Sequence, residues 1–147
     1  MNIEIKEFNE LSTLELYEIL QVREEVFIVE QNCIYKDLDN KDLTALHLIL
    51  KEDLEIIAYL RILKTKVDSS EISFGRVLVT QKGRGKGYAK LIVNNAIQYI
   101  KKTYKNKTIT IDAQCYLKKF YQGFGFVESS DEFLEDGIPH ICMRKTI

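Results

Sequence analysis

The segment between Val77 and Tyr104 constrains the fold of this chain more than any other part of the sequence. Its first residues, Val77-Leu78-Val79, form an apolar run that is typical of a buried strand. Glycine recurs at every second position from 83 to 87, which predicts a tight turn, and apolar residues from Ala89 to Tyr104 then recur at helical spacing. The chain therefore passes from a strand through a glycine-rich turn into a helix, as in folds that combine a sheet with covering helices.

The turn between this strand and this helix suits an anion such as a pyrophosphate. The first N–H groups of a helix have no partner inside the helix, and the helix dipole places partial positive charge there. Gly83, Gly85 and Gly87 carry no Cβ, which lets an anion approach the backbone, and basic residues alternate with them at positions 82, 84 and 86. The spacing is neither that of a Walker A loop nor GxGxxG. The same residues are equally compatible with a flexible, solvated turn.

Length and charge limit the partners of the chain. At 147 residues, 46% of them hydrophobic, the chain fits one domain, residues 1–147, with a core of ordinary size. The 21 basic and 22 acidic residues are intermixed and leave a net charge of −1, so we expect no nucleic-acid partner and no membrane surface. No run of residues is apolar enough to span a bilayer, and residues 2–10 are too charged for a signal peptide, which favours a cytoplasmic protein.

The three cysteines point to reduced thiols. Cys33, Cys115 and Cys142 are odd in number and lack both a CxxC motif and nearby histidine-ligand spacing. We therefore expect neither a disulfide framework nor a metal site.

The remaining patterns predict a mixed sheet covered by helices. Ser12 and Glu15 form a capping box that opens a helix ending at about Glu30. Two apolar runs separated by Lys51-Glu52-Asp53 predict a hairpin. The expected strands are residues 3–8, 47–50, 56–63, 72–80, 109–111, 126–128 and 138–143, and the expected helices are residues 12–30, 89–105 and 117–124.

Two motifs, in this order along the chain, resemble those of the GNAT N-acyltransferases. Residues 84–89 read RxxGxA, the spacing of the coenzyme A pyrophosphate loop in that family. Gln114 to Phe126 read QxxLxxFYxxxGF, where the family commonly carries NxxAxxLYxxxGF. Further segments are similar to the ElaA branch of the family: residues 23–31, Asp37-x-Asp39, Gly75-Arg76 and residues 136–140. The resemblance covers nearly the whole chain.

The resemblance implies an α/β fold with a mixed, mostly antiparallel sheet of six to seven strands, about four flanking helices, and a cleft where strands four and five splay apart. It also implies acetyl-CoA as the acyl donor, with its pyrophosphate on residues 84–89 and its pantetheine arm along the preceding strand. The expected donor-binding residues are Val77, Leu78, Val79, Arg84, Gly85, Lys86, Gly87, Tyr88, Ala89, Gln114 and Tyr121. The family's tyrosine, here Tyr121, protonates the departing thiolate, although a tyrosine on an apolar helix face is otherwise ordinary core.

The sequence departs from the family at two places that matter for chemistry. Gln114 replaces the usual asparagine, and residues 73–76 lack the glutamate that serves as general base in many relatives. An alkyl ammonium must lose a proton before it attacks a thioester, so another base is required. The candidate bases are Glu30, His47 and His140.

Each candidate base has a structural alternative. Glu30 can take the proton or hold the substrate ammonium, or it can pair with an arginine such as Arg23. His47 lies among leucines on an apolar strand, where a base and a satisfied core histidine are both plausible. His140 either closes over the acceptor or faces solvent.

Two arginines lie on strands that are otherwise apolar. Arg61 and Arg76 either bind an acidic group of the acceptor or pair with Asp37, Asp39 or Glu30. Pairing is favoured, because buried arginines are usually paired with carboxylates.

The sequence therefore predicts an N-acetyltransferase that moves an acetyl group from acetyl-CoA to a primary amine, on a small molecule or a peptide, by direct attack. Cys115 is a rival nucleophile without a recognisable activating base. Two other functions stay open: a catalytically silent acyl-CoA sensor or interaction module, and an acyl-homoserine lactone synthase, whose expected tryptophan this chain lacks. An exposed sheet edge also makes a homodimer possible.

Overall fold

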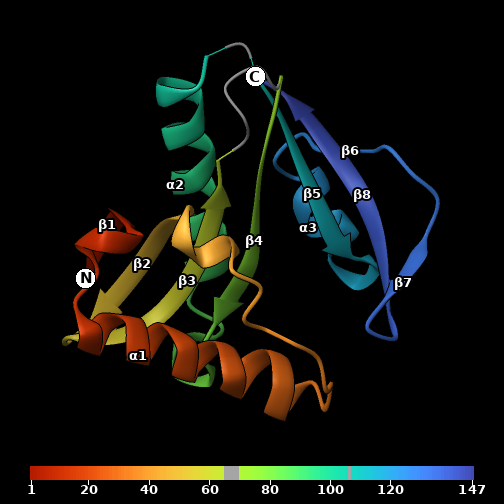
Figure 1. The fold of residues 1–147 in the computed structure, drawn as a ribbon. Helices are drawn as coiled ribbons and strands as arrows, with labels where there is room; N and C mark the ends of the chain where they lie inside the picture. Colours follow the sequence, from red (N-terminus) through yellow and green to blue (C-terminus); the bar gives the residue numbers. More distant parts are fainter. Residues whose placement is uncertain (65–69, 106) are drawn as a thin grey trace.

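The computed structural model describes residues 1–64, 70–105 and 107–147, and within them the chain forms an eight-stranded sheet (Figure 1). The strands are β1 (Asn2–Glu7), β2 (Leu46–Glu52), β3 (Glu55–Leu63), β4 (Glu71–Val79), β5 (Thr108–Gln114), β6 (Val127–Glu128), β7 (Phe133–Glu135) and β8 (Ile138–Thr146). They lie in the order β1-β2-β3-β4-β5-β8-β6, with β7 paired to β8. The β4–β5 pair is parallel, and the other pairs are antiparallel. This is the mixed, mostly antiparallel sheet that the resemblance implied.

The helical elements lie mainly in the connections between strands. They are α1 (Thr13–Arg23), α2 (Tyr88–Thr103), α3 (Lys118–Gln122), the π-helical turn η2 (Glu24–Glu30), and the 3-10 turns η1 (Phe8–Glu10), η3 (Lys41–Leu43), η4 (Gln81–Gly83) and η5 (Cys115–Leu117). Helix α1 begins at the predicted capping box, where Ser12 Oγ accepts a hydrogen bond from the N–H of Glu15 at 3.0 Å. The predicted end of this helical segment at Glu30 is confirmed, although η2 forms its last part.

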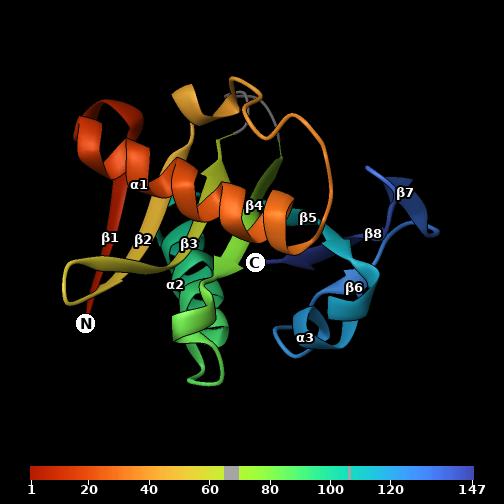
Figure 2. The same cartoon turned by 90° about the horizontal axis from the view of Figure 1, so that it is seen from below.

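Helices α1 and α2 lie on opposite faces of the sheet (Figure 2), and each covers a hydrophobic core. Helix α1 and η2 cover one face, and their core consists of Ile19, Val26, Ile49, Ile56, Tyr59 and Leu78. Helix α2 covers the other face and buries Ile92, Val93, Ala96, Ile97 and Ile100 there, at the spacing that predicted this helix. Helix α3 contributes Tyr121 to the same core as α2.

The sheet opens between β4 and β5. These strands pair over only three residues each, Glu71–Ser73 of β4 and 108–110 of β5. Beyond Ser73, β4 has no strand partner on this side in the described part of the chain, because β5 continues alongside β8 instead (Figure 1). The predicted splay between the fourth and fifth strands is therefore confirmed.

Strand β4 carries a β-bulge where the opening begins. Gly75 lies opposite Arg61 and Leu78 lies opposite Tyr59, so β4 has one residue more than β3 between these pairs. Arg76 lies in the bulge with a φ of 50°, a left-handed conformation that is uncommon for a residue with a side chain. Its side chain lines the opening.

The numbers of elements differ slightly from the prediction. The strand that the sequence patterns did not indicate is β7, which has three residues, two of them exposed, and is too short to display an alternating pattern. About four helices were expected, and the described residues contain three α-helices together with η2. Within the same residues, no helix combines the length and the apolar character needed to cross a membrane.

Candidate active site

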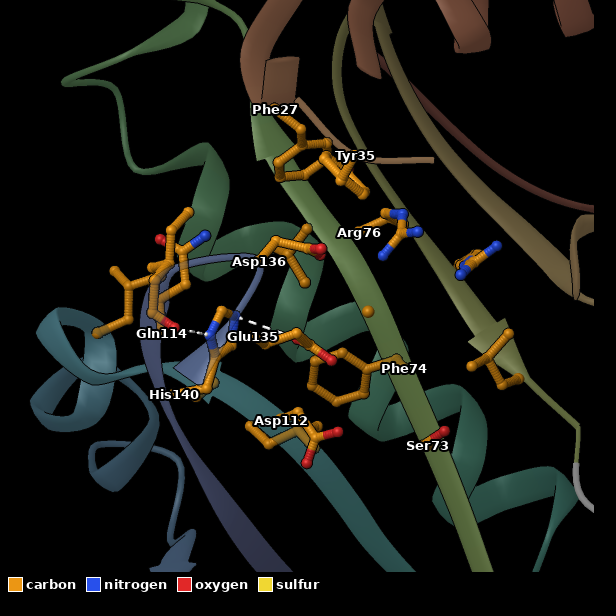
Figure 3. A pocket seen from close by; sticks show the side chains of 18 of the residues that line it. Phe27, Tyr35, Ser73, Phe74, Arg76, Asp112, Gln114, Glu135, Asp136 and His140 are labelled. Carbon is orange, nitrogen blue, oxygen red and sulfur yellow. Dashed lines mark hydrogen bonds and ion pairs between the residues drawn. The ribbon is translucent and has the colours of Figure 1, made fainter. Parts of the chain in front are cut away.

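Two adjoining cavities occupy the opening between β4 and β5. The larger cavity, of about 470 Å³, lies between these strands, the segment after η2 and the β7–β8 hairpin (Figure 3). The smaller cavity, of about 320 Å³, lies between η2, the end of β4, the start of α2 and α3. Val77, Tyr116, Leu117 and Tyr121 line both cavities. The opening therefore offers two spaces that meet beside Tyr121.

The smaller cavity contains the unpaired edge of β4. Val77, Leu78 and Val79 line it, and their backbone groups on the β5 side have no strand partner among the described residues. Unpaired strand groups can hydrogen-bond an extended ligand in place of a neighbouring strand. Ala89, in the first turn of α2, lines the same cavity.

The glycine-rich turn leaves unpartnered amides at the start of α2, where Ala89 lines the smaller cavity. The first backbone hydrogen bond of α2 runs from Leu91 to Gly87, so the N–H groups of residues 88–90 have no partner inside the helix. Gly85 and Gly87 have φ values of 76° and 80°, and no atom lies within 4 Å of where a Cβ would stand. The turn is therefore open to an anion at its backbone.

The side chains of this turn point in different directions. Lys86 is exposed, and the Tyr88 hydroxyl donates a hydrogen bond to the Glu52 carboxylate, away from the smaller cavity. Of the residues predicted for the pyrophosphate loop, Arg84 and Ala89 line the smaller cavity, whereas Gly85, Lys86, Gly87 and Tyr88 line neither cavity.

Arg84 bridges the smaller cavity by pairing with Glu30. Its Nη1 and Nη2 both donate to the Glu30 carboxylate, the second at 2.9 Å, and its Nε donates to the Val79 carbonyl at 3.2 Å. The hydrogen bonds from Arg84 hold the pKa of Glu30 below its usual value. Glu30 therefore has an arginine partner, as its structural alternative foresaw, but the partner is Arg84 and not Arg23. Glu30 lines the smaller cavity and not the larger one.

Tyr121 is a core residue and a cavity residue at once. Only 4% of it is exposed, and its ring lies 6.4 Å from that of Phe74, 5.1 Å from Phe120 and 6.0 Å from Phe126. It still lines both cavities, and no described residue accepts a hydrogen bond from its hydroxyl. Burial raises the pKa of this phenol well above its usual value, so it carries its proton at neutral pH.

His140 brings an imidazole to the larger cavity. It lies on β8 with 7% of its surface exposed, and its Nδ1 donates to the Ile138 carbonyl at 2.7 Å. Its Nε2 lies 3.3 Å from the Glu135 carboxylate at the end of β7 (Figure 3). Because a carbonyl only accepts, Nδ1 carries a proton in this geometry, and Nε2 is the ring nitrogen that faces the Glu135 carboxylate.

His47 is placed away from both cavities. It is completely buried, its Nδ1 accepts from the Tyr59 hydroxyl at 2.7 Å, and its Nε2 donates to the Asp42 carbonyl at 2.9 Å. Burial lowers the pKa of this imidazole, which keeps it neutral. The geometry is that of a satisfied core histidine, and His47 lines neither cavity.

A buried network of arginines and aspartates fixes the wall of the larger cavity. Its members are Arg23, Arg61, Arg76, Asp37, Asp39 and Asp42. Arg23, which is fully buried, contacts Asp37 at 2.9 Å and Asp42 at 2.7 Å, and Arg61 contacts Asp39 at 2.6 Å. The expected pairing of Arg61 and Arg76 with aspartates is therefore observed. The burial of Arg23 was not foreseen, although its place one turn beyond Ile19 on the apolar stripe pointed to it.

Gln114 and Cys115 lie where β5 ends. Gln114 lines the larger cavity, and its Nε2 is 3.4 Å from Oε1 of Gln31, at the beginning of the segment after η2. Cys115 is half-buried, and burial raises the pKa of its thiol. A raised pKa disfavours the thiolate, so Cys115 lacks the activation that a nucleophile needs.

The comparison with known proteins identifies the family. The family model of the acetyltransferase (GNAT) domain matches residues 11–147. The chain belongs to the GNAT acetyltransferase family. Protein ElaA of Escherichia coli is 38% identical over 141 residues, which cover 95% of this chain and 92% of ElaA. The predicted resemblance to the ElaA branch is thus confirmed.

Solved structures agree with this membership. The crystal structure of E. coli ElaA has a TM-score of 0.92 at 36% identity and covers 98% of each chain. That of an acyl-CoA N-acyltransferase from Pseudomonas aeruginosa has a TM-score of 0.92 at 34% identity and covers 99% of each chain. The acyl-homoserine lactone synthase LasI has a TM-score of 0.78 at 14% identity, covering 99% of this chain and 89% of LasI, which shows a shared fold alone.

Proposed function

We propose that this protein transfers an acetyl group from acetyl-CoA to a primary amine by direct attack. The observation that carries the proposal is the meeting of two cavities beside the Tyr121 ring. One cavity has the open backbone of β4, Arg84, and Ala89 in the first turn of α2, and the other has an imidazole and carboxylates. Donor and acceptor would therefore meet at a single phenol, which is the arrangement that a direct transfer needs.

The donor is proposed to lie in the smaller cavity. Its diphosphate would contact the free amides of residues 88–90, with Arg84 exchanging the Glu30 carboxylate for the phosphate oxygens. Its pantetheine arm would hydrogen-bond the β5-facing edge of Val77–Val79. This course places the thioester beside Tyr121, where the two cavities adjoin.

The acceptor is proposed to lie in the larger cavity, with His140 as the general base. Glu135 would attract the substrate ammonium, and Nε2 of His140 would take its proton. The Glu135 carboxylate then stabilises the imidazolium that forms. The neutral amine attacks the thioester carbonyl, and N–H groups along the open edge of β4 stabilise the tetrahedral oxyanion. The C–S bond then breaks, and the proton left on the nitrogen passes to the departing coenzyme A thiolate, which gives the amide and free coenzyme A.

Tyr121 is proposed to act on the leaving group. Its hydroxyl is protonated and has no partner among the described residues, so it is free to donate to the coenzyme A sulfur. Because its pKa is raised by burial, the phenol stabilises the departing thiolate mainly as a hydrogen-bond donor.

The three cysteines form no disulfide, which fits a reducing compartment, and we propose that the enzyme works in the cytoplasm.

Thiol release from acetyl-CoA with a panel of amines tests this function. The panel contains polyamines, aminoglycosides, amino acids, and peptides with free N-termini, and a reaction without amine corrects for hydrolysis. We expect amine-dependent release with at least one class, and acetyl-CoA at about a hundred times its Kd should stabilise the fold by about 2.7 kcal/mol. If acetyl-CoA stabilised the fold but no amine caused thiol release, the result would instead support a catalytically silent acyl-CoA sensor. Absence of both effects would contradict donor binding itself.

A further inference from the structure

The larger cavity carries opposite charges on its two sides. Arg76 on β4 lines one side. Lys36 and Lys41 also line the cavity, and they belong to the segment between η2 and β2 whose Asp37 and Asp39 pair with Arg76. Glu135 and Asp136 of the β7–β8 hairpin line the other side, where His140 also lies. Figure 3 shows Arg76 and the hairpin residues facing each other across the cavity. A molecule that fills this space therefore meets cations at one end and anions at the other.

Arg76 is anchored in a way that leaves part of its guanidinium available. Its Nε donates to Asp37 Oδ1 at 2.9 Å and its Nη2 to the Asp37 carbonyl at 3.2 Å, while the group lies 5.3 Å from the centre of the Tyr35 ring. In the described part of the chain, Nη1 has no hydrogen-bond partner, and 24% of the side chain is exposed. The guanidinium is thus held through Nε and Nη2, of which Nη2 also lies 3.6 Å from Asp39 Oδ2, and it presents the two N–H donors of Nη1.

The other two arginines of the network have no exposed terminal nitrogen that is free to bind a ligand. Arg23 is fully buried and bonded to Asp37 and Asp42. Arg61 is 3% exposed and uses both terminal nitrogens on Asp39 and Asp42.

The charge balance on the Arg76 side favours an anion. The three arginines and three aspartates of the network compensate each other, so Lys36 and Lys41 leave this side with excess positive charge. Arg76 is also the strained residue of the β4 bulge, with a φ of 50°. Such strain persists where the surrounding structure imposes it, and it gathers at ligand-binding sites.

We propose that the acceptor is an amine that also carries a carboxylate, bound by Nη1 of Arg76 with support from Lys36. This inference rests on the proposed function and narrows its substrate class. The carboxylate would meet the free edge of the guanidinium, and the ammonium would lie at the Glu135 and His140 end. A polyamine would place a second ammonium against Arg76 and Lys36, where like charges repel.

Matched substrate pairs test this inference. Thiol release is measured with aminocarboxylates and with amines that lack only the carboxylate: phenylalanine against 2-phenylethylamine, and 4-aminobutyrate against butylamine, with longer ω-amino acids covering other spans. The parent protein should show a kcat/KM roughly tenfold to a hundredfold higher for the aminocarboxylate in at least one pair. Equal use of both members of every pair would overturn the inference and leave the proposed function standing. Absence of release with every compound would overturn both.

Variants at Arg76 assign the preference to this residue. Arg76→Gln should raise KM for the preferred aminocarboxylate by roughly tenfold or more, and the ratio of kcat/KM between the aminocarboxylate and its carboxylate-free partner should fall by a similar factor. Arg76→Lys restores a charge and should recover part of the preference. Arg144→Gln removes an exposed arginine that pairs with Glu71 outside both cavities, so it serves as a control without effect. If Arg76→Gln kept the full preference for the aminocarboxylate, the assignment of carboxylate binding to Arg76 would be overturned. If a variant folds poorly, the comparison of substrate pairs on the parent protein still tests the inference.

Discussion

Tyr121 shows how a single residue can serve packing and chemistry together. Its ring packs in the core beside Phe74 and Phe126, and the residue lines both cavities. The ring can be kept and the hydroxyl removed by one substitution, which separates the two roles.

Tyr121→Phe should lower kcat by roughly 10²- to 10⁴-fold, because the leaving thiolate loses its hydrogen-bond donor. Affinity for acetyl-CoA and the unfolding temperature should change little, since the ring stays in place. Steady-state thiol release, calorimetric binding of acetyl-CoA and thermal unfolding measure the three quantities. Tyr99→Phe, on α2 outside both cavities, is the matched control. A Tyr121→Phe enzyme with undiminished turnover, under conditions where chemistry limits the rate, would refute the assigned role.

Among the candidate residues, sequence patterns indicated the elements well but not the direction of each side chain. Glu30, His47 and His140 were all candidate bases, with a core role favoured for His47, and the tertiary structure separates them. His47 points from β2 toward Tyr59 and Asp42, whereas His140 points from β8 into the larger cavity. A strand alternates its faces, but which face a cavity lies on depends on neighbours distant in sequence.

At the scale of elements, the glycine-rich turn is the feature that depends most on backbone conformation. Gly87 precedes α2 with a φ of 80°, and a Cβ there would meet no protein atom within 4 Å. The space is therefore available to a ligand and would be taken by a side chain. Gly137, in the β7–β8 turn, has a similar φ of 78° and equally open surroundings.

Gly87→Ala and Gly137→Ala form a matched pair for testing the turn. Both should lose about 1 kcal/mol of unfolding free energy, because alanine resists a positive φ. Only Gly87→Ala should also weaken acetyl-CoA binding, since its Cβ would stand where the diphosphate approaches. Chemical denaturation and calorimetric titration measure the two effects. Equal acetyl-CoA affinity in the two variants would argue against a phosphate site in this turn.

The same comparison of elements explains why β7 was not predicted. The connection between β7 and β8 is the dipeptide Asp136-Gly137, and both residues have positive φ, as two-residue hairpin turns require. Asp-Gly is a strong hairpin signal, but the strand before it is too short to show a periodic pattern. Helix α2 and strand β4 before it are long enough to show a clear periodic pattern, and their positions in the sequence were predicted closely.

At the scale of the whole molecule, stability depends on groups that burial keeps uncharged. Burial lowers the pKa of His47, so the folded protein resists protonation of a ring that takes up a proton readily once unfolded. The unfolded state then binds more protons than the folded state, and the free energy of unfolding falls as the pH decreases from about 6.5.

Denaturant unfolding between pH 7.5 and pH 5 tests this dependence. The unfolding free energy should fall at acidic pH by up to about 1.4 kcal/mol per pH unit for one proton. His47→Gln, which can still donate and accept a hydrogen bond, should be less stable at neutral pH and show a flatter dependence over this range. Below this pH range, protonation of the Glu15 carboxylate also affects the unfolding free energy. Burial alone would raise the pKa of Glu15, but hydrogen bonds from Lys6, Ser12 and Lys51 lower it to about 2. A parent protein equally stable at pH 7.5 and pH 5 would contradict the effect assigned to His47.

The opening between β4 and β5 also bears on aggregation. A strand with unpaired backbone groups normally invites a strand of another polypeptide, and proteins shield such strands at the rim of a sheet. Here the unpaired stretch of β4 lies in the middle of the sheet, beside a cavity of about 320 Å³ that is the size of a small-molecule site. A second polypeptide would first have to push β5 and β8 aside. The unpaired backbone groups of β4 are thus accessible to a small extended ligand but not to a strand of another polypeptide.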